Sequence, residues 1–462
     1  MHHYTSDELA NITQGVWHAL KGDLKVTFFC FDARMITPGA CFVALSGGVR
    51  DGHEFAVQAV QGGAVAVIVE CRVDVDIPQL VVADSLRALG ALGAANRAVF
   101  SNPVVAITGS CGKTSTKEML RLLLGETVTH ATAGNWNNRI GVPMTLLGLD
   151  SQAQTFGVIE AGINQPKEMQ LLGEMIHADL TITTNIGPAH LELLKTIENV
   201  AVEKAHLSEQ AKHQSPVIFP SKLLQYPSFT VMAAHATVLQ LEEDTTLLVD
   251  VHQLVSCRLK ARRNRIHEIL LIDGQTSAAF EVATTSRGIA TNAALAILAA
   301  RKLGILDDDI RQRLKQWLPV GNRGKIIQSA QQLFYVDCYN ANPSSMSDAL
   351  QAFTAAVDDV LPRAYVLGAM NELGEGGETA HFDIGQQLRL RPQDTAFFVG
   401  PDALSAAYEA GALDAGNSLH ALKRVDSVEK IKLDIAQFEG TLFLKGSRSY
   451  QLEKLLPDGL QY

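Results

Sequence analysis

The sequence predicts an α/β protein of three domains, with a central domain built on a mainly parallel, doubly wound sheet. Three observations support this fold class. The 462 residues suit about three domains of ordinary size. Apolar runs typical of buried strands alternate with helical segments along most of the chain. The chain breakers in Leu318-Pro319-Val320-Gly321 separate the last part of the chain from the rest.

The composition excludes several other classes of protein. Apolar residues make up 47% of the chain and charged residues 19%, which is typical of a protein with buried cores. The net charge of −10 argues against a nucleic-acid or anionic-membrane partner, because both require a positive surface. No apolar run suits a membrane span, and no secretory signal is visible. The six cysteines form no CxxC pair, so a reducing, cytoplasmic location is expected.

The elements expected in the first domain, residues 1–88, are short strands and one helical stretch near residues 53–62. The strand-like runs are VTFFCFDAR, CFVALS, AVAVIVE and QLVVAD. The second domain, residues 89–317, opens with the helical pattern of ALGAANRAVF. Helical segments then alternate with the strand-like runs VVAITG, TFGVIEAG, ADLTITTNIG and SPVIFP, and a strong helix follows in GIATNAALAILAARKLGI. This alternation predicts a parallel sheet with helices on both faces.

The third domain, residues 318–462, repeats the alternation and predicts a second, smaller, Rossmann-like α/β sheet. Its strand-like runs are LFYVDCYN, RAYVLGAM, TAFFVG and GTLFLKG.

A phosphate-binding loop is the most informative motif. An apolar strand leads to two glycines and then to a helix that starts near Lys113, and the N–H groups of such a turn cradle phosphate oxygens. Lys113 is expected to neutralise the terminal phosphates, and the Thr114 hydroxyl to reach a magnesium ion. The motif is a shortened GxxGKT, because Ile107 stands where the longer form has its first glycine. The expected loop consists of Gly109, Ser110, Cys111, Gly112, Lys113, Thr114 and Ser115.

Polar residues also follow two later strands. Glu160 ends the run VIE, and Asn185 and His190 follow the run TITT. Ligands of doubly wound sheets bind at the carboxyl ends of the strands, so Thr114, Glu160 and His190 are expected to converge on the phosphates and their metal. Taken singly, His190 also suits an ordinary loop histidine and Glu160 a helix-capping acid. Lys204 lies in a helical stretch, and its spacing alone favours an ordinary surface lysine.

Seven segments together resemble the Mur ligase family of ATP-dependent, amide-forming enzymes that extend the peptide of the peptidoglycan precursor. They run in family order and are TGSCGKTS, GNWNNRIGVP, EAG, TNIGPAHLE, VDCYNANP, LGAMNELG and LKGSRS. YNANPSSM and LKGSR resemble the branch that adds D-alanyl-D-alanine to UDP-N-acetylmuramoyl-tripeptide. Residues 38–55 resemble a UDP-binding domain found in the last two ligases of that pathway.

The resemblance implies roles for the residues around the phosphates. Lys113 and Arg323 would contact the ATP phosphates, and Thr114 and Glu160 would hold a magnesium ion. His190 would ligate a second magnesium ion. Lys204 matches a family lysine whose amine becomes a carbamate that helps to hold the second metal.

Further roles follow for the nucleotide and the substrates. Asn135 and Asn292 would lie near the nucleotide, Asp337 would bind its ribose, and Asn340 would lie against the adenine. The residues implied at the substrates are Arg34 near UDP, Asn137 and Asn138 facing the muramoyl peptide, and Glu372, Leu373, Lys445, Ser447 and Arg448 near D-Ala-D-Ala. The implied partners are thus the UDP-linked tripeptide and D-Ala-D-Ala, with ATP and two Mg²⁺ ions, in a monomeric enzyme that needs no nucleic acid and does not insert into membranes.

The chain departs from the family pattern at several positions. Ala33 replaces a serine hydroxyl near the expected uracil site, and Gly288-Ile289 replaces a His-Asn pair before Asn292. Ala205-His206 follows Lys204 where the family tends to have Gly-Glu. Asn371 replaces a small apolar residue before Glu372.

Four alternatives remain open. Two are related ligases: the sister enzyme that adds the third peptide residue, and a folylpolyglutamate synthase. The third is a regulatory P-loop switch protein, although the sequence has no NKxD-type base-reading motif. The fourth is a catalytically inactive scaffold, which the intact Lys113, Glu160 and His190 disfavour.

Overall fold

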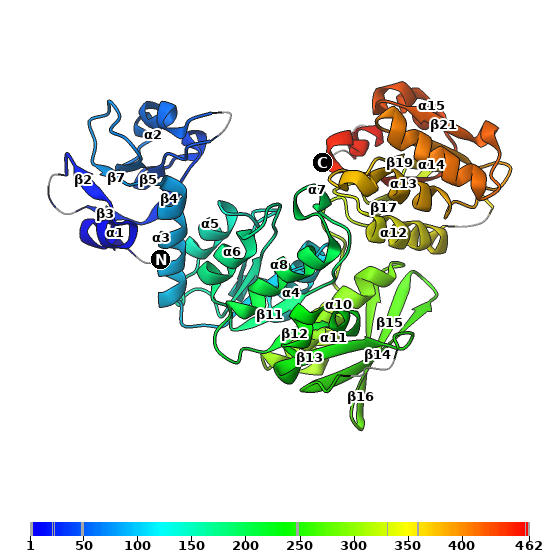
Figure 1. The fold of residues 1–462 in the computed structure, drawn as a ribbon, viewed down its shortest axis with the longest axis horizontal. Helices are drawn as coiled ribbons and strands as arrows, with labels where there is room; N and C mark the ends of the chain where they lie inside the picture. The colour runs from blue at the N-terminus through cyan, green and yellow to red at the C-terminus, as the bar shows by residue number, and fades with distance from the viewer. Residues whose placement is uncertain are drawn as a thin grey trace.

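The structure is a computed structural model that describes residues 3–20, 22, 24–47, 50–245, 249–329, 331–357, 360–457 and 459–460. Residues 48 and 49 of the UDP-type segment 38–55 therefore lie outside the described residues. Figure 1 shows three lobes, with the N-terminal and C-terminal lobes placed on opposite sides of a central one. Within the described residues, no helix combines the length and the apolar character that crossing a membrane requires.

The N-terminal lobe is built on a five-stranded sheet of order β2-β7-β6-β5-β4, which is parallel except where β2 pairs with β7. Its strands are β2 (Val16–His18), β4 (Phe28–Cys30), β5 (Ala40–Val43), β6 (Ala66–Val69) and β7 (Gln79–Val81). A separate antiparallel pair joins β1 (Tyr4–Thr5) to β3 (Lys25–Val26). The helices are α1 (Ser6–Thr13), α2 (Ala56–Gln61) and α3 (Ser85–Val99).

Helix α3 connects the N-terminal lobe to the central lobe. Asp84 caps it by accepting the backbone N–H of Arg87 at 2.8 Å, and the helix packs against both α1 and the central helices α5 and α6. The predicted boundary after residue 88 falls inside this helix.

The central sheet has nine strands in the order β16-β15-β14-β13-β12-β11-β8-β10-β9. It is parallel from β9 to β14 and antiparallel from β14 to β16, so the predicted mainly parallel fold is confirmed. Its strands are β8 (Val104–Thr108), β9 (Thr129–Ala131), β10 (Phe156–Glu160), β11 (Leu180–Thr183), β12 (Val217–Pro220), β13 (Ala236–Leu241), β14 (Gln253–Arg262), β15 (Ile266–Asp273) and β16 (Thr276–Ala283). Its helices are α4 (Lys113–Leu124), α5 (Gly141–Leu147), α6 (Glu168–Ile176), α7 (Leu191–Leu194), α8 (Ile197–Glu209), α9 (Pro227–Thr230), α10 (Arg287–Lys302) and α11 (Asp307–Leu314).

Strand β8 shows why the central sheet is doubly wound. Its side chains alternate between the two faces of the sheet. Val105 and Ile107 pack into a core with α4 and α10, whereas Val104 and Ala106 pack into a second core with α5, α6 and α8. Because both faces of the strand are buried, its sequence is apolar from Val104 to Ile107.

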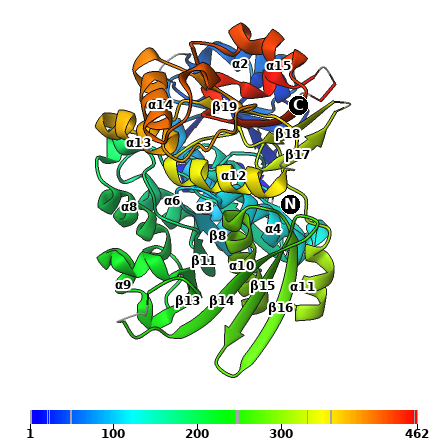
Figure 2. The same cartoon turned by 90° about the vertical axis from the view of Figure 1, so that its right-hand side faces the viewer.

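The C-terminal sheet has six strands in the order β17-β18-β22-β19-β20-β21, and only the β17–β18 pair is antiparallel. Its strands are β17 (Lys325–Gln328), β18 (Gln332–Val336), β19 (Arg363–Gly368), β20 (Thr395–Val399), β21 (Leu422–Val425) and β22 (Gly440–Lys445). The helices are α12 (Pro343–Ala356), α13 (Gly377–Gly385), α14 (Asp402–Asp414) and α15 (Lys432–Gln437). Figure 2 shows α12 between this sheet and the central lobe, where it contacts α10.

The strand order places the chemically important strand ends together. Strand β8 lies between β10 and β11, and all three run parallel. Glu160 pairs in register with Ile107, and Thr183 pairs with Thr108, so the three strands end at nearly the same level. The segments that follow them therefore meet at one edge of the sheet, facing the C-terminal lobe.

Candidate active site

The phosphate loop connects β8 to α4 through two glycines in conformations with positive φ, 149° at Gly109 and 80° at Gly112. A side chain at Gly112 would collide with the amide of Asn292, whose nitrogen would lie 2.5 Å from the added Cβ. Lys113 begins α4, and its Nζ donates to the carbonyl of Gly109 at 2.8 Å. Burial lowers the pKa of Lys113, and the charge of Glu160 acts in the opposite direction.

The segment after β11 holds this loop in place. The Asn185 side-chain oxygen accepts the backbone N–H groups of Ser110 and Cys111 at 3.1 and 3.0 Å. Ser110 Oγ donates to the carbonyl of Gly187 at 3.0 Å, and Thr184 donates to the carbonyl of Cys111 at 2.5 Å. No side chain caps the N-terminus of α4, so the N–H groups of its first turn remain available to bind an anion.

Glu160 lies at the edge of the same loop and is 1% exposed. Its Oε1 accepts the side-chain amide of Asn137 at 2.7 Å, and its backbone N–H donates to the Thr132 hydroxyl at 2.9 Å. Its Oε2 has no hydrogen-bond partner among the described residues. A buried carboxylate oxygen without a donor is costly, so this atom is suited to a cation.

Thr114 meets a residue from the segment that joins the central and C-terminal lobes. Arg323 Nη2 donates to the Thr114 hydroxyl at 3.0 Å, and the guanidinium lies 3.6 Å from the ring centre of Tyr339. The stacking on Tyr339 holds this cation beside the phosphate loop.

His190 joins the central lobe to the C-terminal one. Its Nδ1 lies 2.5 Å from Glu372 Oε2, and the hydrogen bond to His190 lowers the pKa of Glu372. Both residues have positive φ, 56° for His190 and 64° for Glu372. Non-glycine residues are uncommon in this region, so the two loops have an unusual backbone conformation where they meet.

Lys204 lies on α8 behind the phosphate loop and is fully buried. Its Nζ has no hydrogen-bond partner in the part of the chain that the structure describes. Burial lowers its pKa well below the ordinary value, and the charge of Lys113 lowers it further. This burial distinguishes Lys204 from the surface lysine that spacing alone favours.

The C-terminal lobe supplies the opposite wall. Lys445 is 1% exposed, and its Nζ donates to Asp337 Oδ2 at 2.7 Å and to the carbonyl of Asn340 at 3.3 Å. Asn342 caps α12, and its amide reaches the carbonyl of Ser110 at 3.5 Å.

The N-terminus of α10 receives a cap from the C-terminal lobe. Asp348 of α12 accepts the hydroxyl of Ser286 at 2.5 Å and the backbone N–H of Gly288 at 2.8 Å. A Cβ at Gly288 would lie 3.0 Å from Asp348 Oδ2, so the departure from His at position 288 leaves room for this carboxylate.

A cleft of about 630 Å³ lies between the two lobes and brings most of the predicted site residues together. The predicted residues that line it are Ser110, Cys111, Gly112, Lys113, Thr114, Ser115, Asn135, Asn137, Asn138, Glu160, His190, Asn292, Arg323, Asp337, Asn340, Glu372, Lys445 and Arg448. Five predicted residues are not among its lining residues: Gly109, Lys204, Arg34, Leu373 and Ser447.

These five residues have other surroundings. Gly109 begins the loop, and its carbonyl accepts a hydrogen bond from Lys113 Nζ. Lys204 is buried near enough to Lys113 for the charge of Lys113 to lower its pKa. Arg34 lies in the N-terminal lobe, exposed and paired with Asp32 at 2.6 Å. Ser447 is buried, and its hydroxyl accepts the backbone N–H of Asn371 at 2.9 Å.

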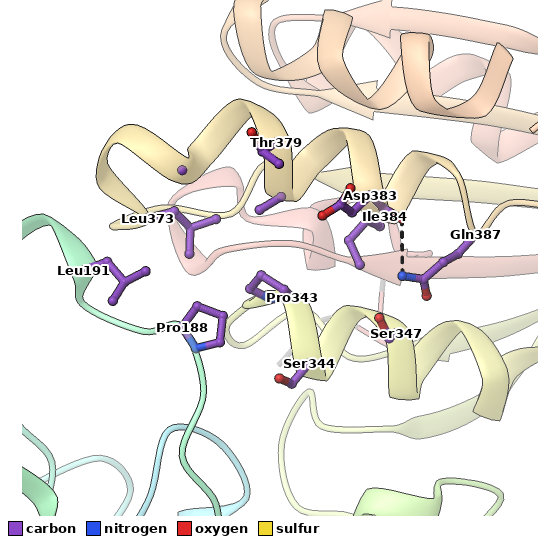
Figure 3. A pocket seen from close by; sticks show the side chains of 12 residues that line it. Pro188, Leu191, Pro343, Ser344, Ser347, Leu373, Thr379, Asp383, Ile384 and Gln387 are labelled. Carbon is purple, nitrogen blue, oxygen red and sulfur yellow. Dashed lines mark hydrogen bonds between the residues drawn. The ribbon is translucent and has the colours of Figure 1, made fainter. Parts of the chain in front are cut away.

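Leu373 faces a second cavity of about 580 Å³ (Figure 3). This cavity is lined mainly by apolar side chains of the loop after β11 and of helices α12 and α13, and Ser344 lines both cavities. Among the described residues that line it, Asp383 alone is charged.

Several residues that the sequence did not single out belong to the site. Asp348 and Tyr339 line the cleft; Tyr339 lies within the VDCYNANP motif, and Asp348 follows it by five residues. Lys117 donates to the carbonyl of Thr132, at the start of the segment that lines the cleft with Asn135 and Asn137. The indication in the sequence is that Lys117 shares a helix face with the apolar residues Leu120 and Leu124, which predicts that it is buried. Among the described residues, no group of three or more His, Cys, Asp or Glu side chains is arranged to hold a metal without help from another ligand.

His381 fixes the segment that carries Glu372. The ring is fully buried, its Nδ1–H donates to the carbonyl of Gly377 at 2.6 Å, and its Nε2 accepts the backbone N–H of Met370 at 2.9 Å. Burial lowers the pKa of His381, although the bond to Gly377 opposes this effect. The neutral ring is therefore required, because an imidazolium has no acceptor for Met370.

We expect His381 to make thermal stability depend on pH. Its contribution is fully present above the ordinary histidine pKa of about 6.5 and is lost as the pH falls toward the lower folded pKa, because the unfolded chain then binds a proton that the folded ring does not. The Tm of His381→Gln should change less between pH 7.5 and 5.5 than that of the wild type. Thermal melts at both pH values measure this, and equal changes in the two proteins would contradict it.

Comparison with known proteins matches this geometry. Residues 25–102 match the model described as Mur ligase family, catalytic domain; residues 107–300 match the Mur ligase middle domain; and residues 322–448 match the Mur ligase glutamate ligase domain. The chain is 31% identical to the UDP-N-acetylmuramoyl-tripeptide--D-alanyl-D-alanine ligase of Escherichia coli (strain K12), over 98% of this chain and 97% of that protein.

Solved structures agree with the sequence comparison. The crystal structure of MurF from Acinetobacter baumannii matches with a TM-score of 0.85 and 29% identity, over 100% of both chains. MurF ligase from Thermotoga maritima in complex with ADP shares the fold, with a TM-score of 0.77 and 24% identity over 93% of this chain and 96% of that one. The family models cover most of the chain, and the Escherichia coli relative extends over nearly all of it. The chain therefore belongs to the Mur ligase family.

Proposed function

We propose that this chain is an ATP-dependent ligase that joins D-alanyl-D-alanine to UDP-N-acetylmuramoyl-tripeptide. The observation that carries the proposal is the cleft in which Lys113, Thr114 and Glu160 meet the C-terminal lobe, in a chain that aligns end to end with ligases of that name. The reaction uses ATP and UDP-linked precursors, so we place it in the cytoplasm. All lobes of the site come from one chain, which supports a monomeric enzyme.

The three domains divide the substrates between them in this proposal. Residues 1–88, with Arg34, take the UDP end of the muramoyl substrate. Residues 89–317 take the ATP phosphates. Residues 318–462 take the ribose at Asp337, the adenine near Asn340, and D-Ala-D-Ala. Glu372, Lys445, Ser447 and Arg448 lie in or beside the loops of the C-terminal lobe, which supports this division.

The proposed reaction has two steps. The γ-phosphoryl group of ATP moves to the terminal carboxylate of the tripeptide, which gives an acyl phosphate and ADP. The amine of D-Ala-D-Ala then attacks the acyl carbon, the C–O bond to phosphate breaks, and the amine loses a proton. Negatively charged groups approach each other in the first step, so Lys113, Arg323 and the first-turn N–H groups of α4 stabilise the developing charge.

The residues of the site fit a divalent cation. Glu160 Oε2 is a buried acceptor without a donor among the described residues, and the Thr114 hydroxyl lines the same cleft. Carboxylate and hydroxyl oxygens are ligands that Mg²⁺ prefers, and we propose that these residues hold one ion and that His190 helps to hold a second. Bound Mg²⁺ would neutralise charge on the phosphates. Arg323 now donates to Thr114, so it must exchange this partner for phosphate oxygens when the nucleotide binds.

Lys204 fits a carbamate. Its amine is buried and without a described partner, and burial lowers its pKa, which favours the uncharged amine that reacts with carbon dioxide. We propose that the resulting anion helps to hold the second ion, beside the charge of Lys113.

The test is phosphate release from ATP with one amine donor at a time. We expect release to require both UDP-N-acetylmuramoyl-tripeptide and D-Ala-D-Ala. Release with the muramoyl dipeptide and a diamino acid would instead identify the sister ligase. Release with a folate and glutamate would identify a folylpolyglutamate synthase, and hydrolysis without any acceptor would point to a switch protein.

A further inference from the structure

Lys117 is a buried lysine that the proposed mechanism does not use. It lies on α4 one turn after Lys113 and is fully buried. Its Nζ donates to the carbonyl of Thr132 at 2.6 Å, lies 3.5 Å from the carbonyl of Gly134, and forms an ion pair with Glu118 at 2.7 Å.

A charged residue at this position calls for a specific reason. Among the other buried positions of α4, Met119, Leu120, Leu123 and Leu124 are apolar, and Ser115 and Thr116 are polar but uncharged. Removing a charge from water is costly unless polar groups replace the solvent, so an uncharged residue is the simpler choice for such a face. Here the replacing groups are the Glu118 carboxylate of the same helix and backbone carbonyls of the segment that begins at Thr132, and the bonds to these carbonyls connect the phosphate-loop helix to that segment.

The segment from Thr132 to Asn137 holds Glu160 at two points. The Thr132 hydroxyl accepts the backbone N–H of Glu160 at 2.9 Å, and the Asn137 amide donates to Glu160 Oε1 at 2.7 Å. The carbonyl of Asn137 also accepts the N–H of Gly162 at 2.8 Å. The segment thus follows β10 past its end and fixes both the main chain and the side chain of Glu160.

We propose that Lys117 is a positioning residue for Glu160, acting through the segment Thr132–Asn137; this inference rests on the proposed role of Glu160 as a ligand of the divalent cation. The lysine holds the segment by the backbone carbonyls of Thr132 and Gly134. The segment in turn orients the Glu160 carboxylate so that Oε2 faces the cleft. Partners that orient a metal ligand typically change metal affinity or activity by about 10- to 100-fold.

The test compares Lys117→Met, which keeps the length and bulk of the side chain and removes its charge, with the wild type. We expect Mn²⁺ to bind about 10-fold more weakly in the presence of ADP, as measured by electron paramagnetic resonance. The Mg²⁺ concentration for half-maximal ligation should rise by about the same factor, while KM for D-Ala-D-Ala stays within about twofold. Lys212→Met removes an ion pair with Asp179 away from the cleft and serves as the matched control, with unchanged Mn²⁺ binding.

A second variant keeps the proposal testable if Lys117→Met does not fold. Thr132→Val removes the hydroxyl that binds the Glu160 N–H, and it should weaken Mn²⁺ binding by a similar factor. If both variants fold, the double variant should lose less than the product of the two single effects, because both act through one segment. Unchanged Mn²⁺ affinity in either folded variant would overturn the proposal. The Mn²⁺ measurement needs no muramoyl substrate, so failure of the proposed ligation would be recognised separately.

Discussion

Lys113→Ala should abolish ligation, with a loss of about 10³-fold or more in kcat/KM for ATP. Lys113 is the first residue of α4 and lines the cleft. Its amine donates to the carbonyl of Gly109 at 2.8 Å, which places it beside the N–H groups of the first turn. Arg323 also lies beside the loop, but its guanidinium is bound to Thr114 and stacked on Tyr339, so it does not take the place of the Lys113 amine. Phosphate release in the presence of both substrates measures the effect.

The same variant should still bind the UDP-linked tripeptide, with an affinity within about twofold of the wild type, because the UDP end is assigned to a different lobe. Calorimetric titration without ATP measures this binding. The exposed Lys222, which pairs with Asp244 at 3.3 Å, provides a matched control, and Lys222→Ala should leave both measurements unchanged. Turnover near the wild-type level in Lys113→Ala would refute the assigned phosphate role.

Lys204→Ala should lose ligation activity by about 10²-fold or more and recover part of it when acetate or formate is added. The lysine is fully buried, and its Nζ has no partner among the described residues. Truncation leaves a space in which a small carboxylic acid takes the place of the proposed carbamate anion. Initial rates of phosphate release over a range of acetate concentrations measure the recovery.

Two controls separate the carbamate from a purely structural role of Lys204. Lys204→Met fills the space, so it should lose activity without recovery in acetate. Lys113→Ala should show no recovery either, because its missing group is a cation. Wild-type activity in Lys204→Ala, with no effect of acetate, would argue against a carbamate.

The convergence of the phosphate loop, Glu160 and His190 could be predicted from the sequence for a local reason. The loop follows β8, Glu160 ends β10 and His190 lies in the segment after β11, and parallel neighbouring strands end at one edge of a sheet. The order of β10, β8 and β11 then brings them together. The strands β13 to β16 were not predicted. Strands β14 to β16 alternate between more buried and more exposed residues, so their apolar runs in the sequence are shorter than those of the fully buried strands.

The contacts between lobes could not be predicted, because they join residues far apart in the chain. His190 meets Glu372, and Asp348 caps α10 from another lobe. Lys445, which the resemblance places near D-Ala-D-Ala, lines the cleft, and its buried amine donates to Asp337. Likewise, Asn137, expected to face the muramoyl peptide, donates its amide to Glu160.

The sequence by itself determined the fold class, the phosphate loop and the family motifs, because these depend on apolar periodicity and on residues that are neighbours in the chain. The tertiary structure decided which charges are buried and what each of them contacts. Lys117 and Lys204 look alike in the sequence, as lysines within helices. One is surrounded by backbone carbonyls and a carboxylate, while the other has no described partner, and burial lowers its pKa. That difference depends on the desolvation and the partners that packing supplies, which no local pattern encodes.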